Sequence, residues 1–351
     1  MTAGLDALDR GAAFWAAAAA LARAPAVEIG ETPADPVFRR DKTVLRRYRP
    51  IAAASDRAPV VIVHGLVGRA TMTDLDADRS LVRALLARGV ATHVVDWGRP
   101  SRADRFLRFE DFVCDHLAAV VAAVTRAEGR RPALFGICQG GIFALCLGAL
   151  APGAAAGLAL AVTPVDFDAD ADAPLVRWAR AFGAAEVERL IDAFGYLPGG
   201  VMGAVFQALT PAKTSRKYTL DLLDVARDPG RLALFLRMER WLADRPDHPG
   251  EAAKQLVIEL YQRNALARGA FRLDGAPVRL SDIRAPVLAL YGLRDHIAPP
   301  ACCRALGPLL DPATPYAEQG LDAGHIGVFV SGRARRALAA ALLDWLATLG
   351  D

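Results

Sequence analysis

A cysteine stands at the centre of a short glycine-rich segment, LFGICQGGIF, at residues 134–143. The segment has the G-x-S-x-G outline of a nucleophile elbow, a sharp turn between a strand and a helix, but Cys138 replaces the serine. So tight a backbone leaves no room for β-carbons beside the nucleophile, which explains Gly136 and Gly140. The free N–H groups of the following helix would stabilise a thiolate. The pattern predicts a cysteine nucleophile, but it also fits a buried structural cysteine unless partners exist.

A cysteine nucleophile needs a base and a group that orients the base. Of the histidines after Cys138, His248 lies in the polar stretch DRPDHPG, which predicts a solvated loop. His325, in DAGHIGVF, follows the last weak strand, and Asp295, in LYGLRDHIAPP, directly follows an apolar strand. Each residue alone is more simply a loop or turn residue. Together they have the order nucleophile, acid, histidine of α/β-hydrolases, so we expect a triad.

The tetrahedral intermediate of acyl transfer also needs two hydrogen-bond donors for its oxyanion. In this kind of site one donor is the backbone N–H of the residue after the nucleophile, here Gln139. The other comes from the loop that follows a strand and begins with His64-Gly65, where we expect Leu66 or Val67 to donate. Both donors are backbone groups, so side-chain substitutions there would say little about the site.

The elements that would position these residues alternate between short apolar runs and helical patterns. This alternation predicts an α/β fold of the α/β-hydrolase type, with a mostly parallel sheet and helices on both faces. The predicted strands are residues 59–63, 90–95, 132–136, 157–162, 285–291 and, more weakly, 315–319. The predicted helices are residues 81–88, 111–127, 140–150 and 333–349.

Between residues 174 and 271 the sequence changes to successive helical patterns without strand candidates. The simplest interpretation is a helical cap inserted between two strands, above the carboxyl ends where active sites form. We expect this cap to cover Cys138 and exclude water. The expected units are an N-terminal helical extension, the first part of the core, the cap, and the second part of the core: residues 1–40, 41–170, 171–275 and 276–351.

The composition gives no sign of nucleic-acid binding or of a membrane-spanning segment. Of the 351 residues, 53% are hydrophobic and 23% charged, and the net charge of +3 with scattered arginines does not indicate nucleic-acid binding. The apolar run at residues 11–22 is too short to span a bilayer. It predicts an amphipathic helix that packs on its own domain or docks on a partner or an apolar surface.

The five cysteines have the spacing of neither a disulfide framework nor a zinc site. We find no metal-ligand cluster, phosphate loop or dinucleotide motif in the sequence, and no secretory signal. A reducing cytosol is therefore the expected compartment. Without a base in view, Cys146, Cys302 and Cys303 are expected to be structural.

Several long stretches carry a pattern beyond the triad: TMTDLDADRS (71–80), VVDWGRPSRADR (94–105), GICQGG (136–141), VTPVDF (162–167), DLLDVARDPGRLALFLRMERW (221–241), RDHIAPP (294–300) and GHIGVFVSG (324–332). These stretches resemble the catalytic subunit of polyhydroxyalkanoate synthases, most of all the short class III and class IV enzymes. They occur in order from about residue 44 to the C-terminus. The loop HGLVGRATM departs from the family pattern at Gly68 and Arg69, and the first forty or so residues match poorly.

The resemblance implies that Cys138 is the acylated nucleophile and His325 the general base. It implies that Asp295 is the essential aspartate and His296 an adjacent second histidine. The implied reaction is polymerisation of (R)-3-hydroxyacyl-CoA, chiefly 3-hydroxybutyryl-CoA, with release of CoA. Sulfur suits this reaction, because exchange between thioesters costs little and keeps the acyl group activated. Asp295 would either polarise His325 or assist deprotonation of the attacking hydroxyl.

The resemblance also implies that no cofactor is needed, because CoA is part of the substrate. It implies a second, non-catalytic subunit and a cytoplasmic location at the surface of polymer granules. Two other functions remain open from the sequence. One is a cysteine-dependent thioesterase or depolymerase-like hydrolase, and the other is a granule-associated scaffold without activity, against which the retained triad residues argue.

Overall fold

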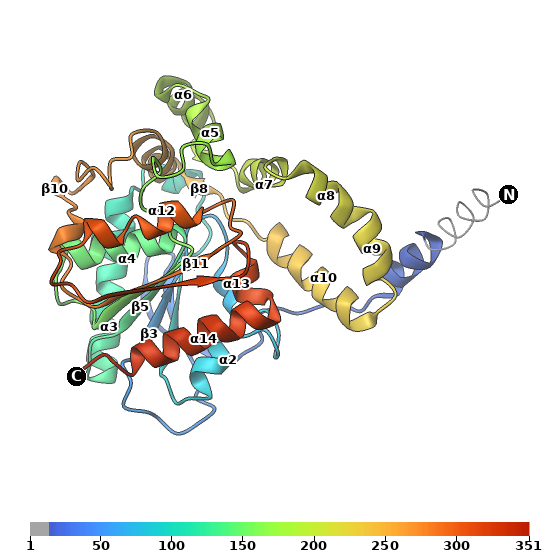
Figure 1. Cartoon of the computed structure of the whole chain (residues 1–351), viewed down its shortest axis with the longest axis horizontal. Helices are drawn as coiled ribbons and strands as arrows, with labels where there is room; N and C mark the ends of the chain where they lie inside the picture. Colours follow the sequence, from blue (N-terminus) through green and yellow to red (C-terminus); the bar gives the residue numbers. More distant parts are fainter. Residues whose placement is uncertain (1–13, 351) are drawn as a thin grey trace.

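The computed structural model describes residues 14–350, apart from the side chain of Lys213. An eight-stranded sheet of order β1-β2-β4-β3-β5-β6-β11-β12 forms its centre (Figure 1). Strand β2 is antiparallel to both neighbours and all other pairs are parallel, which confirms the predicted α/β class. The strands are β1 (Ala34–Arg40), β2 (Thr43–Tyr48), β3 (Val60–Val63), β4 (Thr92–Asp96), β5 (Ala133–Ile137), β6 (Gly157–Ala161), β11 (Val287–Gly292) and β12 (Tyr316–Leu321).

Hydrophobic residues lie on both faces of this sheet. In β3, Val61 and Val63 pack into one buried cluster, while Val60 and Ile62 pack into the other. This follows from the alternation of side chains along a strand, and it explains why the parallel strands are continuously apolar. One face is covered by η3 (Asp111–Leu117), α3 (Ala118–Glu128) and α4 (Gln139–Leu150), and the other by α2 (Leu81–Leu86), α13 (Gly327–Val330) and α14 (Gly332–Leu346).

The N-terminal segment differs in part from the expected helical extension over residues 1–40. The start of the predicted apolar helix, up to residue 13, lies outside the described part of the chain, and residues 14–23 are helical. However, β1 begins at Ala34 and pairs with β2, so the sheet starts before the expected boundary. The sequence ADPVFRR conceals this strand because its side chains are mostly exposed, as is usual for a charged edge strand.

The segment expected to be the cap is helical, and helices α7 to α10 extend from the sheet as an arm (Figure 1). The two ends of the arm are joined by a short antiparallel ladder of β7 and β8, which the sequence did not predict. Helix α11 and η4 pack against the sheet, not in the arm. The elements are α5 (Pro174–Arg180), α6 (Ala184–Phe194), β7 (Tyr196–Leu197), α7 (Gly199–Ala208), α8 (Pro211–Tyr218), α9 (Leu220–Val225), α10 (Pro229–Ala243), β8 (His248–Pro249), α11 (Gly250–Lys254) and η4 (Gln255–Gln262).

The remaining elements are short connections around the sheet. Within residues 14–350, none of the helices has the length and hydropathy of a membrane span. The short elements are η1 (Ala70–Thr73), η2 (Arg102–Asp104), β9 (Arg272–Leu273), β10 (Ala276–Pro277), η5 (Leu280–Asp282), α12 (Pro300–Arg304) and η6 (Gly307–Leu309).

Candidate active site

Cys138 lies at the sharp turn between β5 and α4, as the glycine pattern predicts. Its backbone has φ 53° and ψ −120°, a conformation that non-glycine residues rarely adopt and that clusters at functional sites. A β-carbon on Gly136 would lie 2.4 Å from the Cα of Gly141, and one on Gly140 would lie 2.1 Å from the carbonyl oxygen of Val63. The glycines are therefore required by the close approach of α4 to β3 and β5.

Asp295 and His325 come together although 30 residues separate them. His325 Nδ1 donates to Asp295 Oδ2 at 2.7 Å, and the Asp295 side chain is fully buried. The other carboxylate oxygen, Oδ1, accepts the backbone N–H groups of Ile297 at 2.8 Å and Ala298 at 2.9 Å. Both oxygens are thus engaged, and the carboxylate orients the imidazole from a position outside the cavity.

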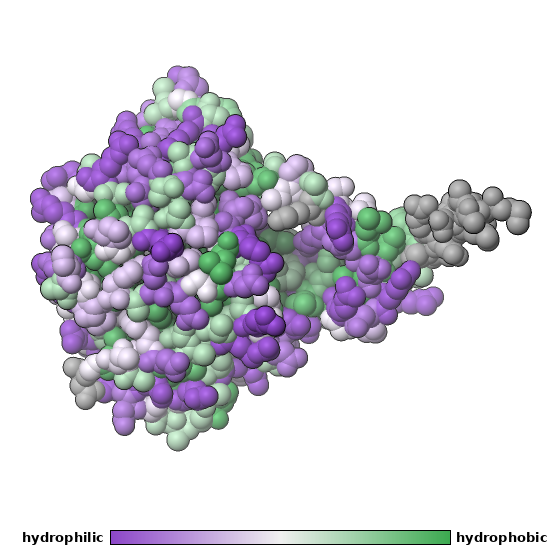
Figure 2. Space-filling model, in the orientation of Figure 1, coloured by the Kyte–Doolittle hydropathy of each residue, from purple (hydrophilic) through white to green (hydrophobic). Residues whose placement is uncertain are grey.

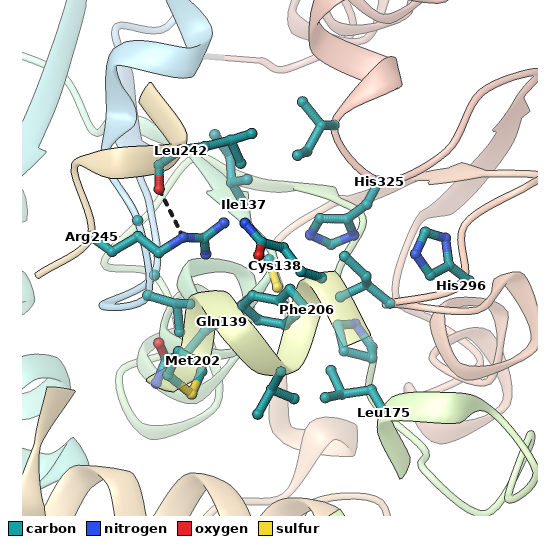
Figure 3. Close-up of a pocket in the computed structure, with 18 of the residues that line it drawn as sticks. Ile137, Cys138, Gln139, Leu175, Met202, Phe206, Leu242, Arg245, His296 and His325 are labelled. Carbon is teal, nitrogen blue, oxygen red and sulfur yellow. Dashed lines mark hydrogen bonds between the residues drawn. The ribbon is translucent and has the colours of Figure 1, made fainter. Parts of the chain in front are cut away.

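The His325 ring lies between Asp295 and Cys138. Burial alone would lower the pKa of His325, but the Asp295 carboxylate and the adjacent Cys138 sulfur outweigh burial and raise that pKa well above its ordinary value. Because Nδ1 is bound to Asp295, Nε2 is the ring nitrogen left to exchange a proton with Cys138. Figure 3 shows His325 beside Cys138 and His296 farther away on the other side of His325. His296 lines the same cavity.

The expected oxyanion donors are arranged differently from the prediction. Gln139 is 3% exposed, and its side-chain Oε1 accepts the Leu66 N–H at 2.8 Å. Gly65 allows this because a β-carbon there would lie 2.8 Å from Gln139 Cβ. The Leu66 N–H is therefore occupied by protein in this conformation, whereas Val67 lines the cavity. The sequence prediction gave the side chain of Gln139 no role. In the structure this side chain binds the Leu66 N–H, which is one of the two candidates for the second oxyanion donor.

His248 is not in a solvated loop, and that prediction is wrong. It is 1% exposed, and its Nε2 lies 2.9 Å from Gln139 Nε2, so it accepts a hydrogen bond from the amide. Its Nδ1 lies 3.3 Å from the Pro249 carbonyl oxygen. Burial lowers the pKa of His248 to about 4, so the ring is neutral near pH 7. The polar neighbours of His248 suggested exposure, but β8 pairs with β7, and the ring is buried against the Gln139 side chain.

A cavity of about 330 Å³ opens above Cys138, which is itself partly buried. Residues of the sheet loops line one side, and residues of the predicted cap line the other, including Leu175, Phe206 and Trp241. Figure 2 shows hydrophobic side chains in the recess between the body of the molecule and the arm. The cavity suits an apolar acyl chain whose reacting end is at Cys138.

The other cysteines show no comparable arrangement. Cys146, Cys302 and Cys303 are buried, and burial raises the pKa of each thiol, that of Cys302 to about 12. They remain thiols at neutral pH and differ from Cys138 in having no imidazole partner in the described part of the chain. Among residues 14–350 there is no cluster of three or more His, Cys, Asp or Glu side chains that could hold a metal ion.

Comparison with known proteins shows which family this chain resembles. A family described as "Protein of unknown function (DUF3141)" matches residues 51–349. The poly(3-hydroxyalkanoate) polymerase subunit PhaC of Allochromatium vinosum is 38% identical over 330 residues, which cover 93% of this chain and 91% of that protein. The same subunit of Synechocystis sp. is 36% identical over 323 residues, which cover 91% of this chain and 85% of that protein.

A solved structure supports the fold alone. A hydrolase from Pseudomonas aeruginosa PA01 superimposes with a TM-score of 0.55 at 17% identity, covering 90% of this chain and 99% of that chain. Together with the sheet order, this shows the α/β-hydrolase fold that the sequence predicts.

Proposed function

Since the chain belongs to the family of poly(3-hydroxyalkanoate) polymerase PhaC subunits, which are acyltransferases, we propose that it polymerises (R)-3-hydroxyacyl groups from their CoA thioesters. We propose 3-hydroxybutyryl-CoA as the principal substrate. The observation that carries the proposal is the buried Asp295–His325 pair next to Cys138 in its strained elbow. These residues supply a nucleophile, a base and an orienting carboxylate beneath an apolar cavity.

In the proposed first step, His325 accepts the thiol proton of Cys138, and the sulfur attacks the thioester carbonyl. The new carbon–sulfur bond forms as the bond to CoA breaks, and CoA leaves with the proton carried by His325. In the second step, the 3-hydroxyl of an incoming hydroxyacyl thioester attacks the acyl group on Cys138. His325 takes the hydroxyl proton, the ester bond forms, and the Cys138 thiolate is released to accept the chain again.

We assign Asp295 an orienting role, acting through His325. Its carboxylate is fully buried and both oxygens are bound, so it cannot reach a substrate hydroxyl without giving up these contacts. For the oxyanion we propose the Gln139 backbone N–H and a second N–H from Leu66 or Val67. If Leu66 is the second donor, the Gln139 side chain must first leave it.

We propose that the sheet is the catalytic unit and that the arm is its cap. The proposed units are those expected from the sequence, residues 1–40, 41–170, 171–275 and 276–351, except that β1 (Ala34–Arg40) belongs to the core and not to the N-terminal extension. Relatives are named as subunits, and we infer that this chain also works with a second, non-catalytic subunit. Because the product is an insoluble polyester, we place the working enzyme at the surface of polymer granules in the cytoplasm. No cofactor is required by the proposed steps.

Incubation of the purified chain with 3-hydroxybutyryl-CoA tests the function. We expect free CoA, measured by thiol titration, together with insoluble poly(3-hydroxybutyrate), and neither product from Cys138→Ala. Release of CoA with only free 3-hydroxybutyrate would support a thioesterase instead. Normal polymer formation by Cys138→Ala would refute the assigned nucleophile.

A further inference from the structure

The charged side chains that line the cavity above Cys138 are all basic. Three basic side chains line it, Arg69, Lys217 and Arg245, whereas no aspartate or glutamate is found among its described lining residues. A low-dielectric recess lined by one sign of charge attracts ligands of the opposite sign. The lining therefore fits a substrate that carries negative charge as well as an apolar acyl group.

Two of the three cations are already neutralised by carboxylates outside the lining. Arg69 bonds Asp96 at 2.9 Å, and Lys217 forms an ion pair with Glu239. For Arg245, no carboxylate within residues 14–350 lies inside the 4.0 Å limit of an ion pair. A half-buried cation without a counter-ion is costly, and burial accordingly lowers the pKa of Arg245.

Arg245 is nevertheless held firmly in place. Its Nε donates to the Leu242 carbonyl oxygen at 3.0 Å, and its guanidinium carbon lies 5.2 Å from the centre of the Phe206 ring. Gly203 of α7 leaves room for the side chain, because a β-carbon there would lie 3.3 Å from both Cδ and Nε of Arg245. These contacts involve the aliphatic part of the Arg245 side chain, its Nε and the face of the guanidinium. The guanidinium end points towards Cys138 in Figure 3.

We propose that Arg245 is an anion-binding residue of this cavity and that its ligand is a phosphate group of the acyl-CoA substrate. This assignment rests on the proposed function, which supplies CoA as the carrier. The flexible pantetheine arm separates the phosphates from the thioester, so it would lie along the cavity between Arg245 and Cys138. The phosphate supplies the counter-ion that the protein lacks at Arg245, and the guanidinium binds it by charge-assisted hydrogen bonds.

Binding of three CoA fragments tests the assignment without turnover. Affinities for CoA, dephospho-CoA and pantetheine are measured by titration calorimetry on the full chain carrying Cys138→Ala. We expect Arg245→Gln to weaken CoA binding about ten- to a hundredfold, the worth of a charged hydrogen bond, and to leave pantetheine binding unchanged. Arg245→Lys keeps the charge and should retain part of the affinity. A loss for CoA and dephospho-CoA alike assigns the diphosphate, and a loss for CoA alone assigns the 3′-phosphate.

The matched control is Arg227→Gln. Arg227 is an exposed arginine of the same region, paired with Asp224 and absent from the cavity lining, so its loss should change none of the affinities. Thermal unfolding of each variant shows whether it folds normally.

Two results would overturn the assignment: unchanged CoA affinity in Arg245→Gln, or equal weakening for CoA and pantetheine. If the wild-type chain still makes polymer, either result removes only the Arg245 assignment. A wild-type chain that neither binds CoA nor uses its thioesters would remove the proposed function as well.

Discussion

At the scale of single residues, the interaction between Asp295 and His325 determines the protonation of the proposed base. Asp295→Asn removes the carboxylate that does most to raise the pKa of His325, so only Cys138 still opposes the lowering of that pKa by burial. We expect kcat to fall about 10²- to 10⁴-fold, because the imidazole loses both its orientation and its stabilised cationic form.

The same substitution has a direct spectroscopic consequence. In a chain that carries Cys138→Ala, the NMR titration midpoint of His325 reports the balance between burial, which lowers the midpoint, and the Asp295 carboxylate, which raises it. Addition of Asp295→Asn should move that midpoint below 6.5, because burial then acts without the opposing carboxylate. The His325→Gln chain identifies the signal. An unchanged midpoint would show that Asp295 does not control the imidazole, and the orienting role would be lost.

A second residue-scale prediction concerns the link from Leu66 through Gln139 to His248. His248→Leu leaves the buried Gln139 amide without its acceptor, so we expect the free energy of unfolding to fall by about 1–3 kcal/mol. His248→Gln provides a neutral acceptor and should cost much less. Chemical denaturation of both variants measures the difference, and equal losses would show that packing, not the hydrogen bond, matters here.

At the scale of elements, the close packing of α4 against the sheet determines the position of the turn that carries Cys138. A β-carbon on Gly141 would lie 1.9 Å from Thr163 Oγ1, so Gly141→Ala must displace either the helix or the loop after β6. We expect a loss of about 1–3 kcal/mol in unfolding free energy, with reduced activity because Cys138 moves with the helix. In Gly200→Ala, on α7, the new β-carbon meets nothing within 4 Å, and it should be neutral or stabilising by up to about 1 kcal/mol. Equal stability of the two variants would contradict this account.

The elements also show what the sequence could predict. The buried parallel strands were found because continuous apolar runs such as that of β3 have few other interpretations. Strand β1 was missed because most of its side chains are exposed and its sequence, ADPVFRR, contains no continuous apolar run. The three proposed catalytic residues were identifiable from their order and from the strand ends before them. The burial of His248 was not, since it depends on a pairing between β7 and β8, which lie about 50 residues apart.

At the scale of the whole molecule, three buried histidines make the fold sensitive to acid. Burial lowers the pKa of His64, His93 and His248 to about 4, while unfolding returns each to about 6.5. The unfolded chain therefore binds protons that the folded chain does not, and stability falls as the pH drops from about 6.5 to 4, by up to about 1.4 kcal/mol per pH unit for each ring. His325 acts in the opposite direction, because its raised pKa adds stability that is lost only as the pH rises through that pKa.

The rings of His93 and His248 do not contact Cys138, Asp295 or His325. Their contribution to the pH dependence of the free energy of unfolding can therefore be measured by substitution. Neither His93→Gln nor His248→Gln leaves a titrating group, and each should flatten the dependence of unfolding free energy on pH between 6.5 and 4 by one ring's contribution. Denaturant unfolding at several pH values measures this slope, and the double variant should show the sum of the two changes because the rings belong to different parts of the molecule. A slope in the double variant equal to that of the wild type would mean that these rings are protonated in the folded state, and the neutral acceptor assigned to His248 beneath Gln139 would then be wrong.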